Sequence, residues 1–119
     1  MNDLIWRPAP SLAKLEAGDA RHIELFARGS LRLELYAPRG HDPQSPHAQD
    51  ELYIVQQGSG TFRRAGQSCE FAVGDVLFVP AGVEHRFEAF SEDLCVWVIF
   101  YGPAGGESPD GGGGETADA

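Results

Sequence analysis

Basic residues are scarce in this chain. Nine Lys and Arg stand against eighteen Asp and Glu, which gives a formal net charge of −9. Because a phosphate backbone is itself negative, this balance argues against nucleic acid as a partner. Four of the acids follow Tyr101 in a segment without any Lys or Arg, so the acidic excess is partly a property of the C-terminal end: Glu107, Asp110, Glu115 and Asp118.

Long apolar runs and an export signal are also missing. No run of about eighteen apolar residues occurs, so no membrane-spanning helix and no membrane partner are predicted. The first twelve residues lack the basic start, apolar middle and small-residue cleavage site of a signal peptide. We therefore expect a cytoplasmic protein.

Cysteine is almost absent. The two cysteines, Cys69 and Cys95, lie in separate apolar segments, and neither belongs to a Cys-x-x-Cys motif or a Cys/His cluster. A structural disulfide would be unusual in a protein without an export signal. We expect both to be buried free thiols without a catalytic role.

A long helical pattern is missing as well, and short strands take its place. The 119 residues suffice for one domain. Residues 21–101 alternate between strand-like segments and Gly or Pro turns, beginning with a hairpin that turns at Gly29 and Ser30. The last of these segments, 94–101, is apolar on both faces and is predicted to be a central strand. The pattern predicts an all-β sandwich or closed barrel.

The two ends of the chain differ from this body. Residues 1–20 predict an N-terminal arm with Trp6 as a packing anchor against the barrel or a second subunit. They also predict one or two helical turns that Ser11 caps and Gly18 ends. Residues 102–119 contain seven glycines and no large apolar side chain. Such a composition does not offset the entropy of ordering, so it predicts a disordered tail.

Polar side chains gather where one of the apolar strands begins. Ser45, His47, Gln49, Glu51 and Tyr53 share one parity, so they would project to the same side of an extended chain. Burying such a face is costly unless the polar groups are hydrogen-bonded or bind something. A metal ion would satisfy them.

A second segment supplies another histidine. After Gly74 an apolar strand runs to a turn at Pro80 and Gly82, and the returning chain begins with His85. Turn residues at these positions reverse the chain, so we expect His85 to face the same interior as Glu51.

Together the two segments resemble the paired motifs of the cupin superfamily. The first motif is matched by His47, Glu51 and the glycine at 58, while Ser45 occupies the place of its first histidine. The second motif is matched by Gly74, Pro80, Gly82 and His85, with Ala89 in place of its closing asparagine.

The resemblance implies a double-stranded β-helix, or jelly-roll, barrel over residues 21–101. It also implies a divalent metal, Fe, Mn, Ni or Zn, held by His47, Glu51 and His85. Two imidazoles and one carboxylate suit non-haem Fe(II), and with a water they also suit Zn²⁺. Gln49 is a candidate for a further oxygen ligand, with a structural hydrogen bond as the alternative.

Other residues are candidates for the pocket wall. Ser45 and Tyr53 share the parity of the ligands, and Phe87 follows His85 by two residues. Tyr53 would offer a ring and a hydroxyl to a ligand, and Phe87 an apolar surface. Plain core packing is the alternative for both aromatic residues.

Two functions from different classes remain open. One is a metal-dependent enzyme of dioxygenase, isomerase, lyase or decarboxylase type acting on a small organic molecule, with no catalytic side chain assigned. The other is a metal-free small-molecule-binding or sensory barrel, in which Ser45 marks the loss of the metal site. A structural role with an empty pocket is a third possibility. The family also implies a homodimer.

Overall fold

The computed structural model describes residues 4–108, which form one helix and eight strands. In chain order these elements are α1 (Pro8–Glu16), β1 (His22–Arg28), β2 (Leu31–Tyr36), β3 (Asp50–Gln57), β4 (Gly60–Arg64), β5 (Gln67–Phe71), β6 (Val76–Val79), β7 (His85–Phe90) and β8 (Cys95–Tyr101). No helix in this part of the chain has the length and hydropathy needed to cross a membrane.

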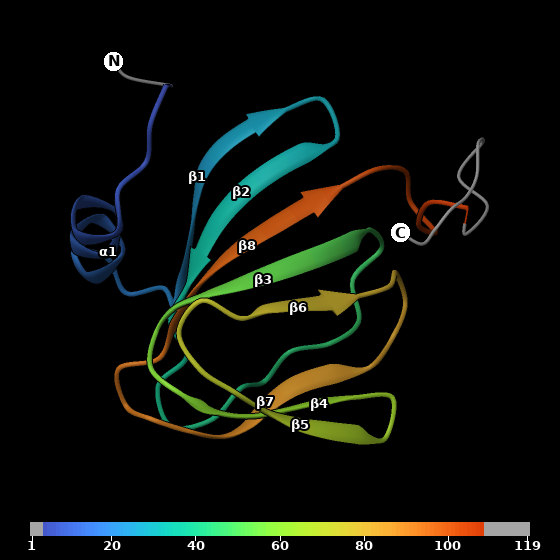
Figure 1. Ribbon diagram of the computed structural model, residues 1–119. Coiled ribbons are helices and arrows are strands. Elements are labelled where there is room, and N and C mark those ends of the chain that lie inside the picture. Colours follow the sequence, from blue (N-terminus) through green and yellow to red (C-terminus); the bar gives the residue numbers. More distant parts are fainter. Residues whose placement is uncertain (1–3, 109–119) are drawn as a thin grey trace.

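The strands form two antiparallel sheets that face each other (Figure 1). One has the order β1-β2-β8-β3-β6 and the other the order β5-β4-β7. The predicted jelly-roll fold is confirmed. The β1–β2 hairpin turns at Gly29 and Ser30, and β8 lies between β2 and β3, so the apolar segment 94–101 does supply a central strand.

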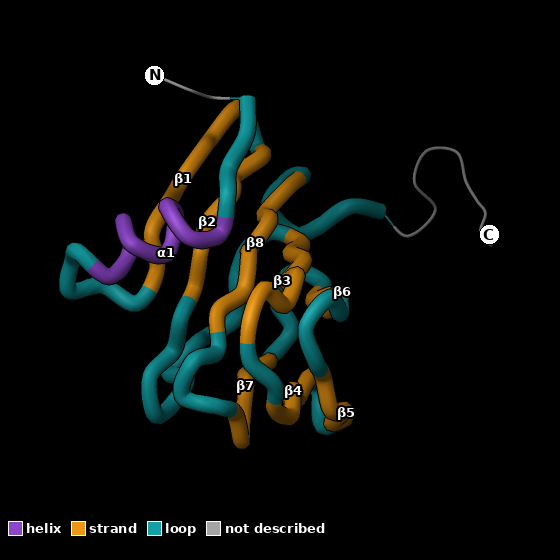
Figure 2. Tube along the Cα trace, turned by 60° about the vertical axis from the view of Figure 1, so that its left-hand side comes forward, coloured by secondary structure: helices purple, strands orange, loops and turns teal. Residues whose placement is uncertain are grey.

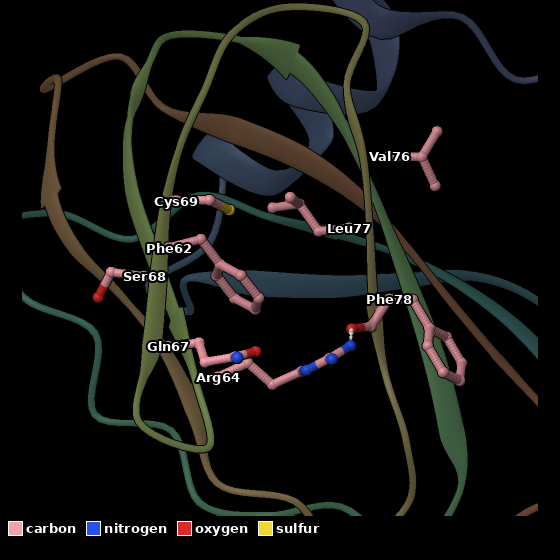
Figure 3. A pocket seen from close by; sticks show the side chains of 8 residues that line it. All are labelled: Phe62, Arg64, Gln67, Ser68, Cys69, Val76, Leu77 and Phe78. Carbon is pink, nitrogen blue, oxygen red and sulfur yellow. Dashed lines mark hydrogen bonds between the residues drawn. The ribbon is translucent and has the colours of Figure 1, made fainter.

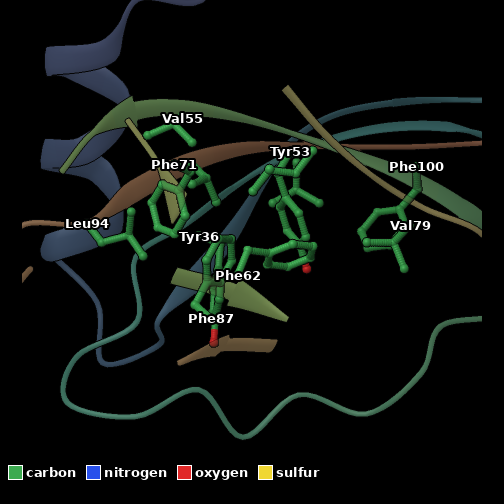
Figure 4. Packing of buried hydrophobic residues seen from close by; sticks show 12 residues of the cluster. Tyr36, Tyr53, Val55, Phe62, Phe71, Val79, Phe87, Leu94 and Phe100 are labelled. Carbon is green, nitrogen blue, oxygen red and sulfur yellow. The ribbon is translucent and has the colours of Figure 1, made fainter. Parts of the chain in front are cut away.

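Aromatic rings fill the space between the sheets (Figure 4). Tyr53 on β3 and Phe87 on β7 lie with their ring centroids 5.0 Å apart, and Phe62 on β4 lies 5.8 Å from Tyr53. Phe71 on β5 meets Phe87 from the other side at 5.4 Å. Edge-to-face contacts of this kind add to the stabilisation from burial, so this cluster stabilises the packing of the two sheets against each other.

The N-terminal arm packs on the outside of the larger sheet (Figure 2). The prediction that Ser11 caps the helix was wrong, because α1 begins at Pro8 after Arg7, and Ser11 is buried inside it. Proline suits the first turn of a helix, where no backbone donor is needed. Leu15 joins a small cluster with Leu35 of β2, and Trp6 lies 5.1 Å from the Phe26 ring, so Trp6 does anchor the arm on the barrel.

The first part of the predicted disordered tail is held in place by hydrogen bonds. Gly102 accepts a hydrogen bond from Gln49, the Gly105 amide donates to Ala48, and the Glu107 amide donates to Asp50. These contacts use backbone groups of residues 102–108, which composition does not reveal, so the tail prediction fails for this segment. Residues 109–119 lie outside the described part of the chain.

The two thiols differ in exposure. Cys95 is buried at the start of β8, where burial raises the pKa of its thiol to about 11. Cys69 is exposed on β5, so the prediction of a buried thiol was wrong there. The reason is that β5 is an edge strand whose side chains are exposed at every position before Phe71.

Candidate metal centre

Three residues from two distant parts of the chain meet at one end of the barrel. His47 comes from the loop before β3, Glu51 is the second residue of β3, and His85 is the first residue of β7. One ligand atom from each lies within 4.8 Å of the others. The structure thus places His85 beside the other two, as the sequence led us to expect.

The corner after β6 holds this arrangement together. The Gly82 amide donates to the carbonyl oxygen of His47 at 2.7 Å, and the Ala81 amide donates to Oδ1 of Asp50 at 2.9 Å. Gly82 has φ of +78°, a left-handed conformation that glycine adopts without strain. The Pro80-x-Gly82 motif therefore binds the loop of His47 and the start of β3, and then continues into His85.

Glu51 and His85 form the buried half of the cluster. Glu51 is 1% exposed and His85 is 3% exposed, and His85 Nε2 lies 3.3 Å from Glu51 Oε1. Among the described residues, neither carboxylate oxygen of Glu51 nor Nε2 of His85 has a hydrogen-bond partner of acceptable geometry. Buried polar atoms without partners are costly, so these three atoms fit a bound cation.

The second nitrogen of His85 fixes the direction of the first. Nδ1 lies 2.9 Å from the Val83 carbonyl oxygen, and because a carbonyl only accepts, Nδ1 carries the proton in the neutral ring. Nε2 then presents its lone pair toward Glu51. Burial alone would lower the pKa of His85, but the Glu51 carboxylate, the Val83 carbonyl and Asp42 outweigh burial and raise the pKa.

His47 closes the cluster from the solvent side. Its side chain is 35% exposed, and Nε2 lies 3.8 Å from Glu51 Oε1. The ring packs 5.3 Å from the His85 ring and edge-on to Phe100 of β8 at 5.1 Å. The site is therefore open on one side and apolar on the other.

The alternation of side-chain directions predicted for residues 45–53 does not extend into the loop before β3. The strand begins at Asp50, so the alternation holds for Glu51 and Tyr53 but not for the loop that precedes them. Gln49 lies outside the cluster, because its amide nitrogen donates to Ser30 and Gly102 and its oxygen accepts from Arg32. It makes the structural hydrogen bonds that we gave as the alternative to metal binding.

The three predicted wall residues occupy different places. Ser45 is exposed and lines a cavity of about 500 Å³ together with His47 and Glu51. Tyr53 and Phe87 are buried in the aromatic core instead, and neither lines that cavity. Burial raises the pKa of Tyr53 well above its ordinary value, so its hydroxyl stays protonated.

The cavity reaches from the cluster toward the larger sheet. Its walls come from the segment before β1 and the first residue of β1, from β2, from the loop before β3 and the start of β3, and from β8: Asp19, Ala20, Arg21, His22, Glu34, Tyr36, Pro43, Gln44, Ser45, His47, Glu51, Val98 and Phe100. A second cleft of about 560 Å³ opens between β4–β5 and β6, and its lining contains no residue of the cluster (Figure 3). The first cavity is lined by His47 and Glu51, so a small molecule bound there would meet the cluster.

Sequence reasoning missed two polar residues beside the cluster. Asp42 is 8% exposed and accepts from the Tyr36 hydroxyl, from the Gln44 amide and from the Phe87 backbone. Gln44 in turn lies against His47 and Tyr53. Both belong to a proline-rich loop that has no periodicity, so no pattern marked them.

Comparison with known proteins supports the fold and its family. The sequence model of the cupin domain family matches residues 32–101. An uncharacterized protein of Streptomyces coelicolor, SCO3923, is 38% identical over 93 residues, which cover 76% of this chain and 89% of that protein. The DMSP lyase DddQ of Ruegeria pomeroyi has a similar structure, with a TM-score of 0.60, 23% identity, and coverage of 68% of this chain and 46% of the lyase.

A regulator is also among the relatives. The transcriptional activator RhaS of Shigella sonnei is 30% identical over 90 residues, which cover 74% of this chain. The matched region is only 30% of the activator. What the two share is thus one part of a longer regulatory protein.

Proposed function

This chain belongs to the cupin domain family, and from that premise we propose that it binds one divalent metal ion through His47, Glu51 and His85 and presents it to a small organic molecule. The observation that carries the proposal is the group of buried, unpartnered atoms on Glu51 and His85. In a metal-free pocket, we would expect the carboxylate oxygens of Glu51 and Nε2 of His85 to form a well-aligned hydrogen bond with each other or with another donor.

The donor set limits the metal. Two imidazole nitrogens and one carboxylate suit Fe, Mn, Ni or Zn and leave positions for water or substrate. Glu51 is the only anion of the three, so it supplies the charge that a divalent ion needs in a buried site. When bound, such an ion supplies a Lewis acid for lyase, isomerase or decarboxylase chemistry, or an O₂ activator for dioxygenase chemistry.

The surrounding residues would bind and orient the organic molecule. A cavity of about 500 Å³ is of the size that holds small ligands. Val98 and Phe100 of β8 offer an apolar wall, while Arg21 and Glu34, which pairs with Val98 across β2 and β8, offer polar groups. Phe100 also packs on His47, so the apolar wall excludes water from one side of that ring.

The likeness to the activator favours one second candidate, a sensory domain that binds a small molecule without turnover. The same cavity would serve it, with or without a metal. A homodimer and a cytoplasmic location stay predictions under both functions.

Elemental analysis tests the proposal directly. The protein should be purified without a chelator and without an affinity metal, next to Glu51→Gln, which keeps the shape of the side chain but removes its charge. We expect one equivalent of metal in the original chain and much less in the variant. Equal and negligible metal in both, also after incubation with Fe²⁺, Mn²⁺, Ni²⁺ and Zn²⁺, would leave the metal-free sensory domain as the better function.

A further inference from the structure

Gln44 stands at the end of a hydrogen-bond chain that leads from the core to the cluster. Its Nε2 donates to Oδ2 of Asp42 at 2.9 Å, and its Oε1 accepts from the Tyr53 hydroxyl at 2.9 Å. Because a carboxylate only accepts, the end of the amide that faces Asp42 is the nitrogen, and the two ends of the amide cannot be exchanged. The amide oxygen of Gln44 is thereby turned away from Asp42.

That oxygen lies beside a ligand atom of the cluster. Gln44 Oε1 is 3.3 Å from Nε2 of His47, the nitrogen that faces Glu51. Two atoms that bind one ion at about 2.0 to 2.2 Å are separated from each other by about 3 Å. The separation between His85 Nε2 and Glu51 Oε1, also 3.3 Å, has the same size.

We propose that Gln44 supplies the fourth protein ligand of the metal, through its amide oxygen, in place of the imidazole that Ser45 lacks. The inference rests on the proposed function, because it concerns the same ion. Ser45 itself is exposed, whereas Gln44 is half-buried and has its oxygen aimed by two neighbours. The site then has two nitrogen and two oxygen donors.

The buried Asp42 acquires a role in this arrangement. It accepts hydrogen bonds from Tyr36, Gln44 and the backbone of Phe87, so its carboxylate is fixed from three directions. A fixed carboxylate that holds the N–H of a metal ligand orients the ligand and makes it a better donor. Asp42 is therefore a positioning residue for Gln44.

A matched pair of histidine variants distinguishes Gln44 from Ser45. In the Cu²⁺-loaded full chain, the nitrogen splittings in the electron paramagnetic resonance spectrum count the coordinated imidazoles. We expect two nitrogens in the original chain, three in Gln44→His, and still two in Ser45→His. At position 44 the new ring would donate to Asp42 and bind the ion through its other nitrogen.

Removal of the amide gives a second readout. By competition with a chelator of known affinity, Gln44→Leu should bind Co²⁺ about 10- to 100-fold more weakly and with a changed visible absorption spectrum. Gln49→Ala, whose amide lies outside the cluster, should change neither quantity. The thermal midpoint of the chelator-treated Gln44→Leu protein shows whether the loss comes from unfolding.

The outcomes separate this inference from the function on which it rests. If the original chain binds Co²⁺ and loses it in Glu51→Gln, but Gln44→Leu keeps the affinity and the spectrum, Gln44 is no ligand and the metal site stands. A third nitrogen in Ser45→His with none in Gln44→His also overturns the inference. If the original chain binds neither Co²⁺ nor Cu²⁺, both proposals fail.

Discussion

The backbone amide of Gly82 and the carbonyl oxygen of His47 are joined by a hydrogen bond of 2.7 Å. One glycine of the second motif thus holds the main chain of a histidine of the first. The spacing between motifs that marks the family at the level of sequence has a physical meaning here: the corner that delivers His85 also fixes the loop of His47.

Gly82→Ala should disturb the metal site more than the fold. No atom lies within 4 Å of the added methyl group, so its cost is the left-handed backbone, about 1 to 2 kcal/mol in the free energy of unfolding. Gly66→Ala in the β4–β5 turn is a matched control, with φ of +85° and equally open space. We expect similar losses in thermal midpoint for both variants and weaker metal binding only for Gly82→Ala. Equal metal affinities would show that the corner does not hold His47.

Glu51→Gln should have opposite effects with and without metal. In chelator-treated protein, at a pH above the raised pKa of His85 where that ring is neutral, the change removes a buried carboxylate without hydrogen-bond partners, so we expect an increase of about 1 kcal/mol in the free energy of unfolding. In the presence of metal, the stabilisation that the ion confers on the original chain should be lost. Thermal unfolding under both conditions measures this, with the exposed Glu92→Gln as a control that changes neither value. A loss of stability in the metal-free variant would contradict the argument.

The pH dependence of the metal-free protein should reflect His85. Its pKa is raised above the ordinary 6.5, so the folded state binds the proton more tightly than the unfolded state does. The stability that this adds is fully present below about pH 6.5 and is lost as the pH rises through the raised pKa. Denaturant unfolding in the presence of a chelator measures the free energy of unfolding of the original chain and of His85→Gln. The difference in favour of the original chain should shrink as the pH rises from about 6.5 through the raised pKa. A difference between the two proteins that does not change with pH would contradict this prediction.

The two thiols should react at very different rates. At pH 8, iodoacetamide should modify the exposed Cys69 and leave Cys95 unmodified, because Cys95 is buried and its pKa is about 11. Mass spectrometry of the native protein should show one adduct, and two after unfolding. Cys69→Ser should show none in the native state. An adduct on native Cys95 would mean that β8 opens readily.

Truncation should separate two parts of the C-terminal end. Ending the chain after Ser108 removes a segment without large apolar side chains, and we expect the thermal midpoint to stay within about 5 °C, which corresponds to roughly 1 kcal/mol. Ending it after Gly102 also removes the hydrogen bonds from Gly105 to Ala48 and from Glu107 to Asp50, at about 1 kcal/mol each. Equal midpoints for the two truncations would show that these bonds contribute little.

The sequence predicted the parts of the site that follow regular rules. Glu51 and His85 could be placed because each lies in a strand or directly after a turn whose residues set its direction. Gln49 and Gln44 could not, because the loop between Pro43 and Asp50 has no period of two, and the side chain that faces the cluster is decided by Asp42 and Tyr53. The hydrogen bonds of residues 102–108 could not be predicted either, because they use backbone groups that almost every residue type carries, and composition does not show which of these groups find a partner.

The cleft between β4–β5 and β6 has a consequence for local opening. β5 and β6 each end a sheet, and on this side of the barrel Arg64 of β4 donates to the carbonyl oxygen of Phe78 at 2.8 Å. Separation of the two sheets there would cost that side-chain bond and some apolar contact, while every strand keeps its own ladder. Hydrogen exchange should therefore be faster for the amides of β6 than for those of β8, which is paired on both sides, and water would enter the aromatic interior first beside Phe62 and Leu77.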